Sequence, residues 1–523
     1  MSGDPCDGSV RNDTLKKQRY LLGSMASPAA FAGVTRSTEH DAMHPLVRLV
    51  GAVLLTLCCV FGGAFAAPPA DRPPNVLFIL VDDFGARDLG CYGSTLYETP
   101  QVDRLAADGA RFTQAYVAYP RCVPSRFAIL TGKHPAPFQK DRDSVHVEPG
   151  RDVTFGRAFQ EAGYDTFYCG KWHLGDGPSA PDRAGFAVTV AAGAAGATRS
   201  HFAPYTESRG KGKGEKELIV GLDDAPPGEY LTDRLVEETV RFIETRRERP
   251  FLAVLAHYAV HTPLEAKEDK TRRYAAKLAG EKLPAPLYER ESAGENLRVQ
   301  NNPTYAGMIE SVDEGVGRLL GTLDRLGIAE RTIVVLASDH GGLSARGNER
   351  GVATSNRPYR AGKGHLYEGG LRIPLIIRWP GHVAKATQID VPVLSTDLFP
   401  TLLGMAGLPA RPADHVDGVS LASLVTSGQA PADRAFYWHN PAPRPTSTGD
   451  QFSSAIRVGG LKLVEFPEDG RVELYDLVHD GGEAKNLAAD RPGDRDRLLG
   501  MLHAWKAKVG AGSRQKQRAR SRN

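Results

Sequence analysis

Three carboxylates and one imidazole follow apolar runs of this sequence and could together bind a metal ion. Two of them come after the run 75–81, and the other two come after the run 332–337. Such runs typically form strands buried on both faces, and open α/β sheets bind ligands beyond the carboxyl ends of these strands. Carboxylate oxygens suit hard divalent cations. We therefore expect a metal site formed by Asp82, Asp83, Asp339 and His340.

A cysteine and a lysine-histidine pair form a second group with chemical potential. Cys122 opens the segment Cys-Val-Pro-Ser-Arg, which ends at Arg126 and continues into an apolar turn and Thr-Gly. Lys171 and His173 lie in Gly-Lys-Trp-His-Leu-Gly, directly after another short apolar run. Taken alone, such a cysteine is most simply a small apolar side chain where a strand gives way to a helix. A chemical role for Cys122 therefore depends on the rest of the chain.

Strands that alternate with helices would position these groups. Val, Ile, Leu and Phe dominate the apolar runs, whereas the intervening segments repeat their apolar residues at helical spacing. This alternation indicates an α/β domain with a large, mostly parallel sheet. The expected strands are 75–81, 163–169, 251–256 and 332–337, and the expected helices are 102–109, 230–246 and 308–323.

The pattern changes beyond residue 407, where short apolar runs alternate with turn residues. These runs favour a small antiparallel sheet, which a helix over residues 494–508 would close. The expected strands are 435–439, 455–458, 461–465 and 472–477. We expect a catalytic domain over residues 74–410, a small α+β domain over 411–510 and a basic disordered tail over 511–523.

The N-terminal region has the pattern of a secretory signal. A charged segment begins at Met43, an apolar run follows, and small residues then form a cleavage site. The run is too short for a comfortable membrane span, so we expect an exported protein with no stable membrane span in its mature form. It would be periplasmic or extracellular, and Met43 would be the true start. We expect an extension over residues 1–42, a signal peptide over residues 43–67 and cleavage near Ala66 or Ala67.

Removal of this leader leaves three cysteines, an odd number for an exported protein. They are Cys91, Cys122 and Cys169. Exported proteins ordinarily use cysteines in disulfide pairs. A Cys91–Cys169 disulfide is compatible with the sequence but not required by it. Either way, one cysteine is left over, which is consistent with its consumption by a modification.

The composition is that of an ordinary globular protein. The 523 residues are 41% hydrophobic and 24% charged, with a net charge of +3. The sequence has no domain-wide basic stripe of the kind that would indicate a nucleic-acid partner.

Several motifs of this chain resemble those of the type I sulfatases, in the family's order. The segment from Cys122 to Arg126 resembles their activation motif, and residues 163–175 resemble their second signature. His261-Thr-Pro resembles their His-x-Pro element, and Lys363 precedes a Tyr-Glu-Gly-Gly segment as their lysine does. The resemblance extends from about residue 75 to 487 and is greatest to the arylsulfatase A and N-acetylgalactosamine-6-sulfatase branch.

This resemblance implies an alkaline-phosphatase-like fold and a modified cysteine. A formylglycine-generating enzyme would oxidise the Cys122 thiol to an aldehyde, whose hydrate is the nucleophile in this family. The hydrate would join Asp82, Asp83, Asp339 and His340 around one divalent metal, with Ca²⁺ the first choice. His340 is the less common residue at its position, and because imidazole is softer than an amide oxygen, Mg²⁺ and Mn²⁺ stay as alternatives.

The resemblance also implies roles for the remaining site residues. Arg126 would hold the hydrated aldehyde. Lys171, Lys363 and His261 would bind the sulfate oxygens, and His261 or Lys363 would protonate the departing alcohol. His173 would remove the proton that drives release of sulfate. The implied substrate is a sulfated small molecule or glycan, hydrolysed through a covalent sulfo-enzyme intermediate.

Three alternatives stay open. A phosphate or phosphonate monoester hydrolase could use the same fold and the same cations. A secreted protein that binds sulfated glycans without turnover is a different class, although such a protein has no need for Cys122. A host that lacks the modifying enzyme would leave the fold inert. Within the sulfatase interpretation, we expect specificity from the loops 175–229 and 267–303.

Overall fold

The computed structural model describes residues 72–139, 145–207, 217–246, 248–348 and 351–511. The predicted extension (1–42), the signal peptide (43–67) and all of the basic tail beyond residue 511 lie outside these residues. Over the described residues, none of the helices combines the length and the apolar character that crossing a bilayer requires.

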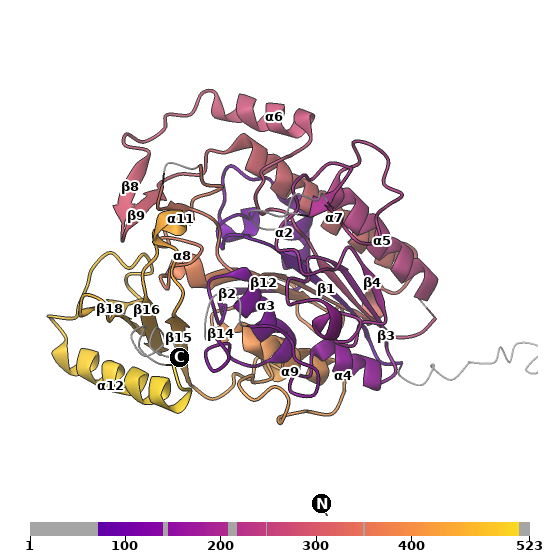
Figure 1. Cartoon of the computed structure of the whole chain (residues 1–523). Helices are drawn as coiled ribbons and strands as arrows, with labels where there is room; N and C mark the ends of the chain where they lie inside the picture. Colours follow the sequence, from indigo (N-terminus) through magenta and orange to yellow (C-terminus); the bar gives the residue numbers. More distant parts are fainter. Residues whose placement is uncertain (1–71, 140–144, 208–216, 247, 349–350, 512–523) are drawn as a thin grey trace, which may run out of the picture. The chain divides into compact units, whose positions relative to one another are not determined.

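A nine-stranded sheet forms the centre of the fold, in the order β13-β2-β12-β10-β1-β7-β3-β4 with β14 beside β2 (Figure 1). Strand β12 pairs antiparallel with β10 and β2, and the other neighbours pair parallel. This confirms the prediction of a large, mostly parallel sheet. The strands are β1 (Asn75–Val81), β2 (Ala110–Tyr116), β3 (Asp165–Gly170), β4 (Val188–Val190), β7 (Phe251–Ala256), β10 (Thr332–Ser338), β12 (Arg372–Arg378), β13 (Thr387–Ile389) and β14 (Val393–Leu394).

Helices cover both faces of this sheet. Every residue of β1 is buried, and its side chains alternate between two separate apolar cores. Phe78 lies in the core beneath α3, α4 and α9, whereas Ile79 lies in the core beneath α2, α5 and α7 (Figure 1). The continuous apolar run therefore reflects burial on two sides. The helices are α2 (Pro100–Ala107), α3 (Cys122–Thr131), α4 (Phe155–Glu161), α5 (Leu231–Arg246), α7 (Pro303–Arg325) and α9 (Leu398–Met405).

The predicted small antiparallel sheet and its helix are also confirmed. The sheet has the order β15-β16-β17-β18. Ile456, on one face, packs against Leu498 of the helix, whereas Trp438, on the other face, belongs to the core of the main sheet. The Trp438 indole Nε1 donates a hydrogen bond to the Val117 carbonyl at 2.7 Å. The elements are β15 (Ala435–Asn440), β16 (Ser453–Val458), β17 (Leu461–Phe466), β18 (Arg471–Asp476) and α12 (Pro492–Lys508).

Two segments that the sequence predicts to be loops contain regular structure. Residues 267–303 form a helix and a hairpin, and α6 escapes prediction because its only buried residues are Lys270 and Tyr274. Instead of an apolar stripe, an ion pair of 2.8 Å between Lys270 and Glu310 attaches this helix to α7. Residues 175–229 contribute the edge strand β4 and a short hairpin. The added elements are α6 (Glu268–Leu278), β5 (Thr206–Glu207), β6 (Glu217–Leu218), β8 (Tyr288–Glu291), β9 (Gly294–Leu297) and β11 (Ala345–Arg346).

The remaining helices are short, and the three described cysteines are unpaired. Cys91, Cys122 and Cys169 are free thiols, so the Cys91–Cys169 disulfide is not formed. The short helices are α8 (Glu368–Leu371), α10 (Ala422–Ser427) and α11 (Pro445–Thr448).

Candidate active site

Two neighbouring strands bring four metal-ligand candidates to one end of the main sheet. Strands β1 and β10 run parallel, with Val81 opposite Ser338, so the residues that follow them meet. The backbone N–H of Asp83 donates to Asp339 Oδ1 at 3.2 Å. All four side chains are buried, which places charged groups where water cannot solvate them. They are Asp82, Asp83, Asp339 and His340.

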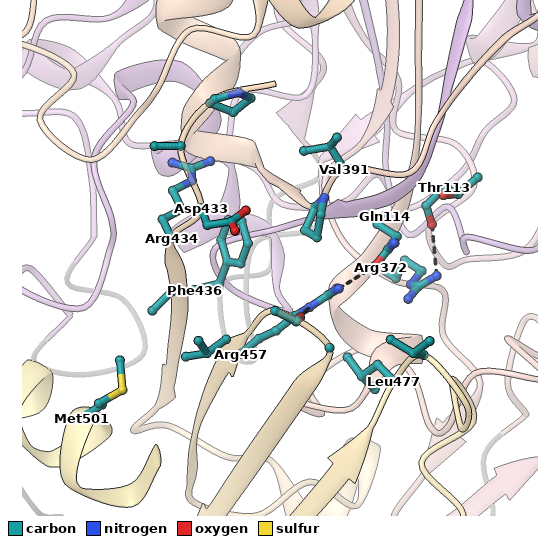
Figure 2. Close-up of a pocket in the computed structure, with 18 residues that line it drawn as sticks. Thr113, Gln114, Arg372, Val391, Asp433, Arg434, Phe436, Arg457, Leu477 and Met501 are labelled. Carbon is teal, nitrogen blue, oxygen red and sulfur yellow. Dashed lines mark hydrogen bonds between the residues drawn. The ribbon is translucent and has the colours of Figure 1, made fainter. Parts of the chain in front are cut away.

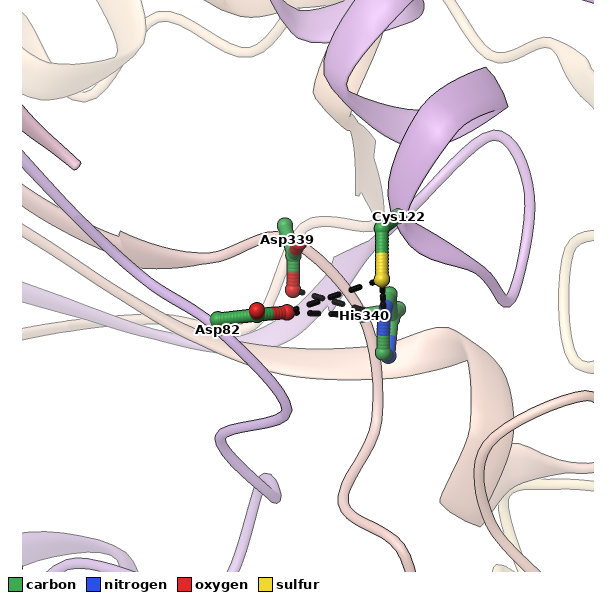
Figure 3. A group of neighbouring side chains, drawn as sticks. All are labelled: Asp82, Cys122, Asp339 and His340. Atoms are coloured by element: carbon green, nitrogen blue, oxygen red, sulfur yellow. Dashed lines mark hydrogen bonds and ion pairs between the residues drawn. The ribbon is translucent and has the colours of Figure 1, made fainter. Parts of the chain in front are cut away.

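Cys122 reaches this cluster from the first residue of α3. Its Sγ lies 3.1 Å from His340 Nε2 and 3.6 Å from Asp82 Oδ1 (Figure 3). One potential ligand atom from each of Asp82, Cys122, Asp339 and His340 lies within 4.8 Å of the others, as in a metal-binding group. A helix that begins at Cys122 therefore places its side chain beside residues at the ends of β1 and β10.

The remaining predicted cations surround the same cluster. Lys171, the residue after β3, pairs with Asp82, and Lys363 Nζ lies 2.6 Å from Asp83 Oδ1. The fully buried Arg126 donates from Nε to Asp339 Oδ2 at 2.9 Å. Each of these cations faces a carboxylate, so the buried charges largely neutralise one another.

The two predicted histidines complete the group. His261 Nε2 lies 3.8 Å from Asp83 Oδ2, and His173 hydrogen-bonds to Cys122. Burial lowers the pKa of both imidazoles below the usual value, so both are neutral near pH 7 in the absence of a bound anion. The structure thus brings together every residue to which the sequence assigned a catalytic or metal-binding role.

The electrostatics of the cluster fit a bound cation. Burial and the neighbouring charge of Asp82 raise the pKa of Asp339 to about 7. Burial opposes protonation of His340, yet Asp339 and the Cys122 thiolate raise its pKa to about 9. Burial is the larger cause for Asp339, but nearby negative charge contributes to both shifts, and a divalent cation would offset that contribution. The oxygen-rich donor set suits a hard ion.

The Cys122 thiol itself is activated. Burial alone would raise its pKa, but the charges of Lys171 and Lys363 hold the pKa well below the usual value. The same positive charge would stabilise any anion at this position, including the oxygens of a bound ester.

A cavity of about 320 Å³ opens above Cys122. Its wall combines segments that are distant in the sequence. The four metal-ligand candidates, Arg126 and Lys171 are buried and do not line it. Gly196 and Ala197 belong to the predicted specificity loop 175–229, whereas no residue of 267–303 lines this cavity, so the role of that second loop in specificity stays a prediction. The lining residues are Tyr119, Arg121, Cys122, Val123, Pro124, Gln139, His173, Gly196, Ala197, His261, Lys363, Ala442 and Arg444.

The segment after β15 forms the part of the wall that the sequence did not reveal. Arg121 donates to Asp450 Oδ1 at 2.6 Å, and Asn440 Nδ2 donates to Asp450 Oδ2 at 2.9 Å. The Tyr119 hydroxyl donates to Asn440 Oδ1 at 2.7 Å. These buried bonds attach the small sheet to the residues that precede Cys122, and they hold Arg444 at the cavity. A local sequence pattern cannot indicate contacts between residues that are more than 300 positions apart in the chain.

A larger groove of about 800 Å³ lies between β2 and the residues just before β14 on one side and β15 and β16 on the other (Figure 2). Its arginines are engaged within the protein: Arg457 donates to Gln114 at 2.6 Å, and Arg372 donates to the Thr113 carbonyl at 3.0 Å. The groove shares no lining residue with the cavity at Cys122 and contains none of the predicted catalytic residues. The smaller cavity is therefore the candidate active site.

Comparisons with known proteins agree with this site. The family described as Sulfatase matches residues 74–408, and the one described as N-sulphoglucosamine sulphohydrolase, C-terminal, matches residues 361–503. Steryl-sulfatase of Mus musculus is 32% identical to this chain, and the alignment covers 88% of this chain and 86% of the steryl-sulfatase. N-acetylgalactosamine-6-sulfatase of Mus musculus is 32% identical, covering 71% and 70%. The solved structure of Ps i-CgsB in complex with k-i-k-neocarrahexaose is 27% identical, with a TM-score of 0.66, and covers 83% and 93%.

Proposed function

The chain belongs to the sulfatase family and is a sulfuric ester hydrolase, and from this we propose that it is exported and cleaves aryl or carbohydrate sulfate monoesters through a formylglycine derived from Cys122. The observation that carries the proposal is the position of the Cys122 Sγ, 3.1 Å from His340 and beside the buried carboxylate of Asp82. A nucleophile at this point touches the metal-binding group and faces a cavity lined by cations.

The proposed metal site uses only buried residues. Asp82, Asp83, Asp339, His340 and the modified residue 122 would hold one divalent cation, with Ca²⁺ favoured and Mg²⁺ or Mn²⁺ as alternatives. When bound, the cation supplies positive charge that favours a deprotonated nucleophile and offsets charge on the sulfate. Arg126 orients this site, because it donates a hydrogen bond to Asp339 and its positive charge interacts with the side chain of residue 122.

The first chemical step transfers the sulfuryl group to the protein. The hydrated aldehyde at residue 122 has two hydroxyls, and one of them, ionised by loss of its proton to water, forms a bond from its oxygen to sulfur. The bond between sulfur and the leaving alcohol oxygen breaks at the same time, and the alcohol takes a proton from His261 or Lys363. Lys171, Lys363 and His261 bind the sulfuryl oxygens. The negative charge of the bound ester would raise the pKa of His261 towards the range in which it can donate.

The second step releases sulfate. His173 removes the proton from the second hydroxyl of residue 122, and its contact with the Cys122 side chain supports this role. The aldehyde carbonyl reforms, the bond between its carbon and the sulfate oxygen breaks, and inorganic sulfate leaves. Water then rehydrates the aldehyde. A serine at this position would have no second hydroxyl and could not complete this step.

Maturation is part of the proposal. Cys122 is 7% exposed, so a formylglycine-generating enzyme would reach the thiol more easily before the chain folds than after. Export through the signal peptide over residues 43–67 would then deliver the protein to the periplasm or the extracellular space.

Parallel assays with 4-nitrophenyl sulfate and 4-nitrophenyl phosphate test the proposed activity. The protein is co-expressed with a formylglycine-generating enzyme, and a Cys122→Ala variant prepared in the same way is the matched control. We expect hydrolysis of the sulfate that depends on Cys122. A preference for the phosphate would instead support a phosphate or phosphonate monoester hydrolase, and tight binding of sulfated glycans without turnover would support a binding protein.

A further inference from the structure

The wall of the active-site cavity is positively charged beyond the place where the reacting sulfate would bind. Among the described residues, Arg121, Lys363 and Arg444 line the cavity, and none of the lining residues is a carboxylate. Arg121 forms an ion pair with Asp450, and Lys363 forms one with Asp83, at 2.6 Å each. Arg444 is half-buried on the segment after β15, outside the group that we assign to the sulfate. A ligand therefore meets an additional permanent cation at the cavity wall.

Gln139 adds a hydrogen-bond acceptor to the same cavity. Its side chain is only 5% exposed, and its amide hydrogen-bonds to the Tyr119 hydroxyl. Because that hydroxyl donates its own proton to Asn440, Gln139 must present its NH₂ group to Tyr119. Among the described residues, none donates a hydrogen bond to Gln139 Oε1. A buried acceptor without a donor is costly, so a ligand that brings a hydroxyl would satisfy it.

The charge of Arg444 acts on the same part of the wall. Burial raises the pKa of Tyr119 to about 12, while the charges of Arg121 and Arg444 and the hydrogen bond from Gln139 oppose this rise. Arg444 and Gln139 thus both lie near the Tyr119 hydroxyl. One ligand that extends from Cys122 along this wall could contact the acceptor and the cation together.

Resting on the proposed function, we propose that the cavity selects sulfated saccharides that carry a second negative charge. Gln139 Oε1 accepts a hydrogen bond from a ring hydroxyl, and the Arg444 guanidinium binds a carboxylate or a second sulfate of the same saccharide. The planar guanidinium fits both anions in a bidentate manner. A neutral aryl or steroid skeleton offers neither the hydroxyl array nor the second charge, so these two residues determine specificity without taking part in bond cleavage.

Competition kinetics test this inference. The formylglycine-containing enzyme hydrolyses 4-nitrophenyl sulfate in the presence of N-acetylglucosamine 6-sulfate or of glucosamine 2-N,6-O-disulfate, which share a ring and differ in one charge. We expect an inhibition constant about tenfold lower for the disulfate, the effect of one charge-assisted hydrogen bond. Arg444→Gln should abolish this preference, and Arg444→Lys should keep part of it. Gln139→Ala should weaken the binding of both saccharides to the same extent, because both carry the ring hydroxyls.

Controls separate the inference from the proposed function. Arg290 is an exposed arginine on β8 that does not line the cavity, so Arg290→Gln should keep the wild-type preference. Melting temperatures establish that each variant is folded. Equal inhibition constants for the two saccharides in the wild type, or a preference that survives in Arg444→Gln, would overturn the inference while the sulfatase activity stands. Absence of turnover of 4-nitrophenyl sulfate by the modified wild type would overturn the proposed function itself.

Discussion

Replacement of Asp450 by Asn tests whether the small sheet is held to the active site by a buried ion pair. Asp450 and Arg121 have side chains that are 1% and 7% exposed, and they lie 2.6 Å apart. The substitution leaves the Arg121 guanidinium buried without its counter-charge. Loss of one partner of a buried pair costs about 3–5 kcal/mol, and neither group is exposed enough for solvent to reduce this value. We expect a loss of this size in the free energy of unfolding at pH 7.

Urea unfolding followed by tryptophan fluorescence measures this loss. Asp469→Asn is the matched control, because Asp469 forms a half-exposed pair with Arg471 at 3.5 Å. Such pairs contribute about 0–1 kcal/mol. Arg121→Met combined with Asp450→Asn should recover part of the loss, since it also removes the unpaired cation. An Asp450→Asn variant that is within about 1 kcal/mol of the wild type would refute the reasoning, because Arg121 would then not depend on Asp450.

The pH dependence of the same variant gives an independent check. Burial would raise the pKa of Asp450, but the charges of Arg121 and His365 hold it below the usual value. A carboxyl whose folded pKa is depressed stabilises the protein above its unfolded pKa of about 4, and this contribution disappears as the pH falls through the folded pKa. The stability difference between the wild type and Asp450→Asn should therefore be constant from pH 7 to 5 and shrink below about pH 4.

Three further predictions address the nucleophile, the metal and the core. Cys122→Ser should lose multiple turnover or stall as a covalent sulfate ester, which intact-protein mass spectrometry detects. Turnover near the wild-type rate would contradict the proposed release step. Exhaustive chelation should abolish hydrolysis of 4-nitrophenyl sulfate and lower the melting temperature, with both restored by a divalent cation, whereas full activity in the chelated protein would exclude the assigned metal site. Trp438→Phe should cost about 1–3 kcal/mol in urea unfolding, because the Val117 carbonyl loses its buried 2.7 Å hydrogen bond; an unchanged free energy of unfolding would show that this bond does not stabilise the joint between the sheets.

The sequence predicts those parts of the fold that local patterns determine. The runs that form β1 and β10 are apolar throughout because both faces of the sheet are covered, and the acidic residues after them meet because the two strands are parallel neighbours. Motif resemblance then identified Cys122 and the residues around it. These predictions needed only the period of the side chains and the order of the motifs.

The parts that the sequence did not predict depend on contacts between distant segments. Arg444 lies at the cavity because buried hydrogen bonds attach the end of β15 to the residues before Cys122, and Gln139 lies there beside the Tyr119 hydroxyl. Helix α6 has no apolar period, since its buried face consists of Lys270 and Tyr274, and an ion pair with α7 replaces the usual apolar stripe. Neither feature produces a signal at the level of spacing or composition.

The mass of the peptide that contains Cys122 tests the central claim most directly. Trypsin cleaves after Arg121 and Arg126, so it releases residues 122–126 as a single peptide from protein made in its native host. We expect a mass loss that matches conversion of the thiol to an aldehyde, in protein that hydrolyses sulfate esters. An unmodified thiol in fully active protein would contradict it.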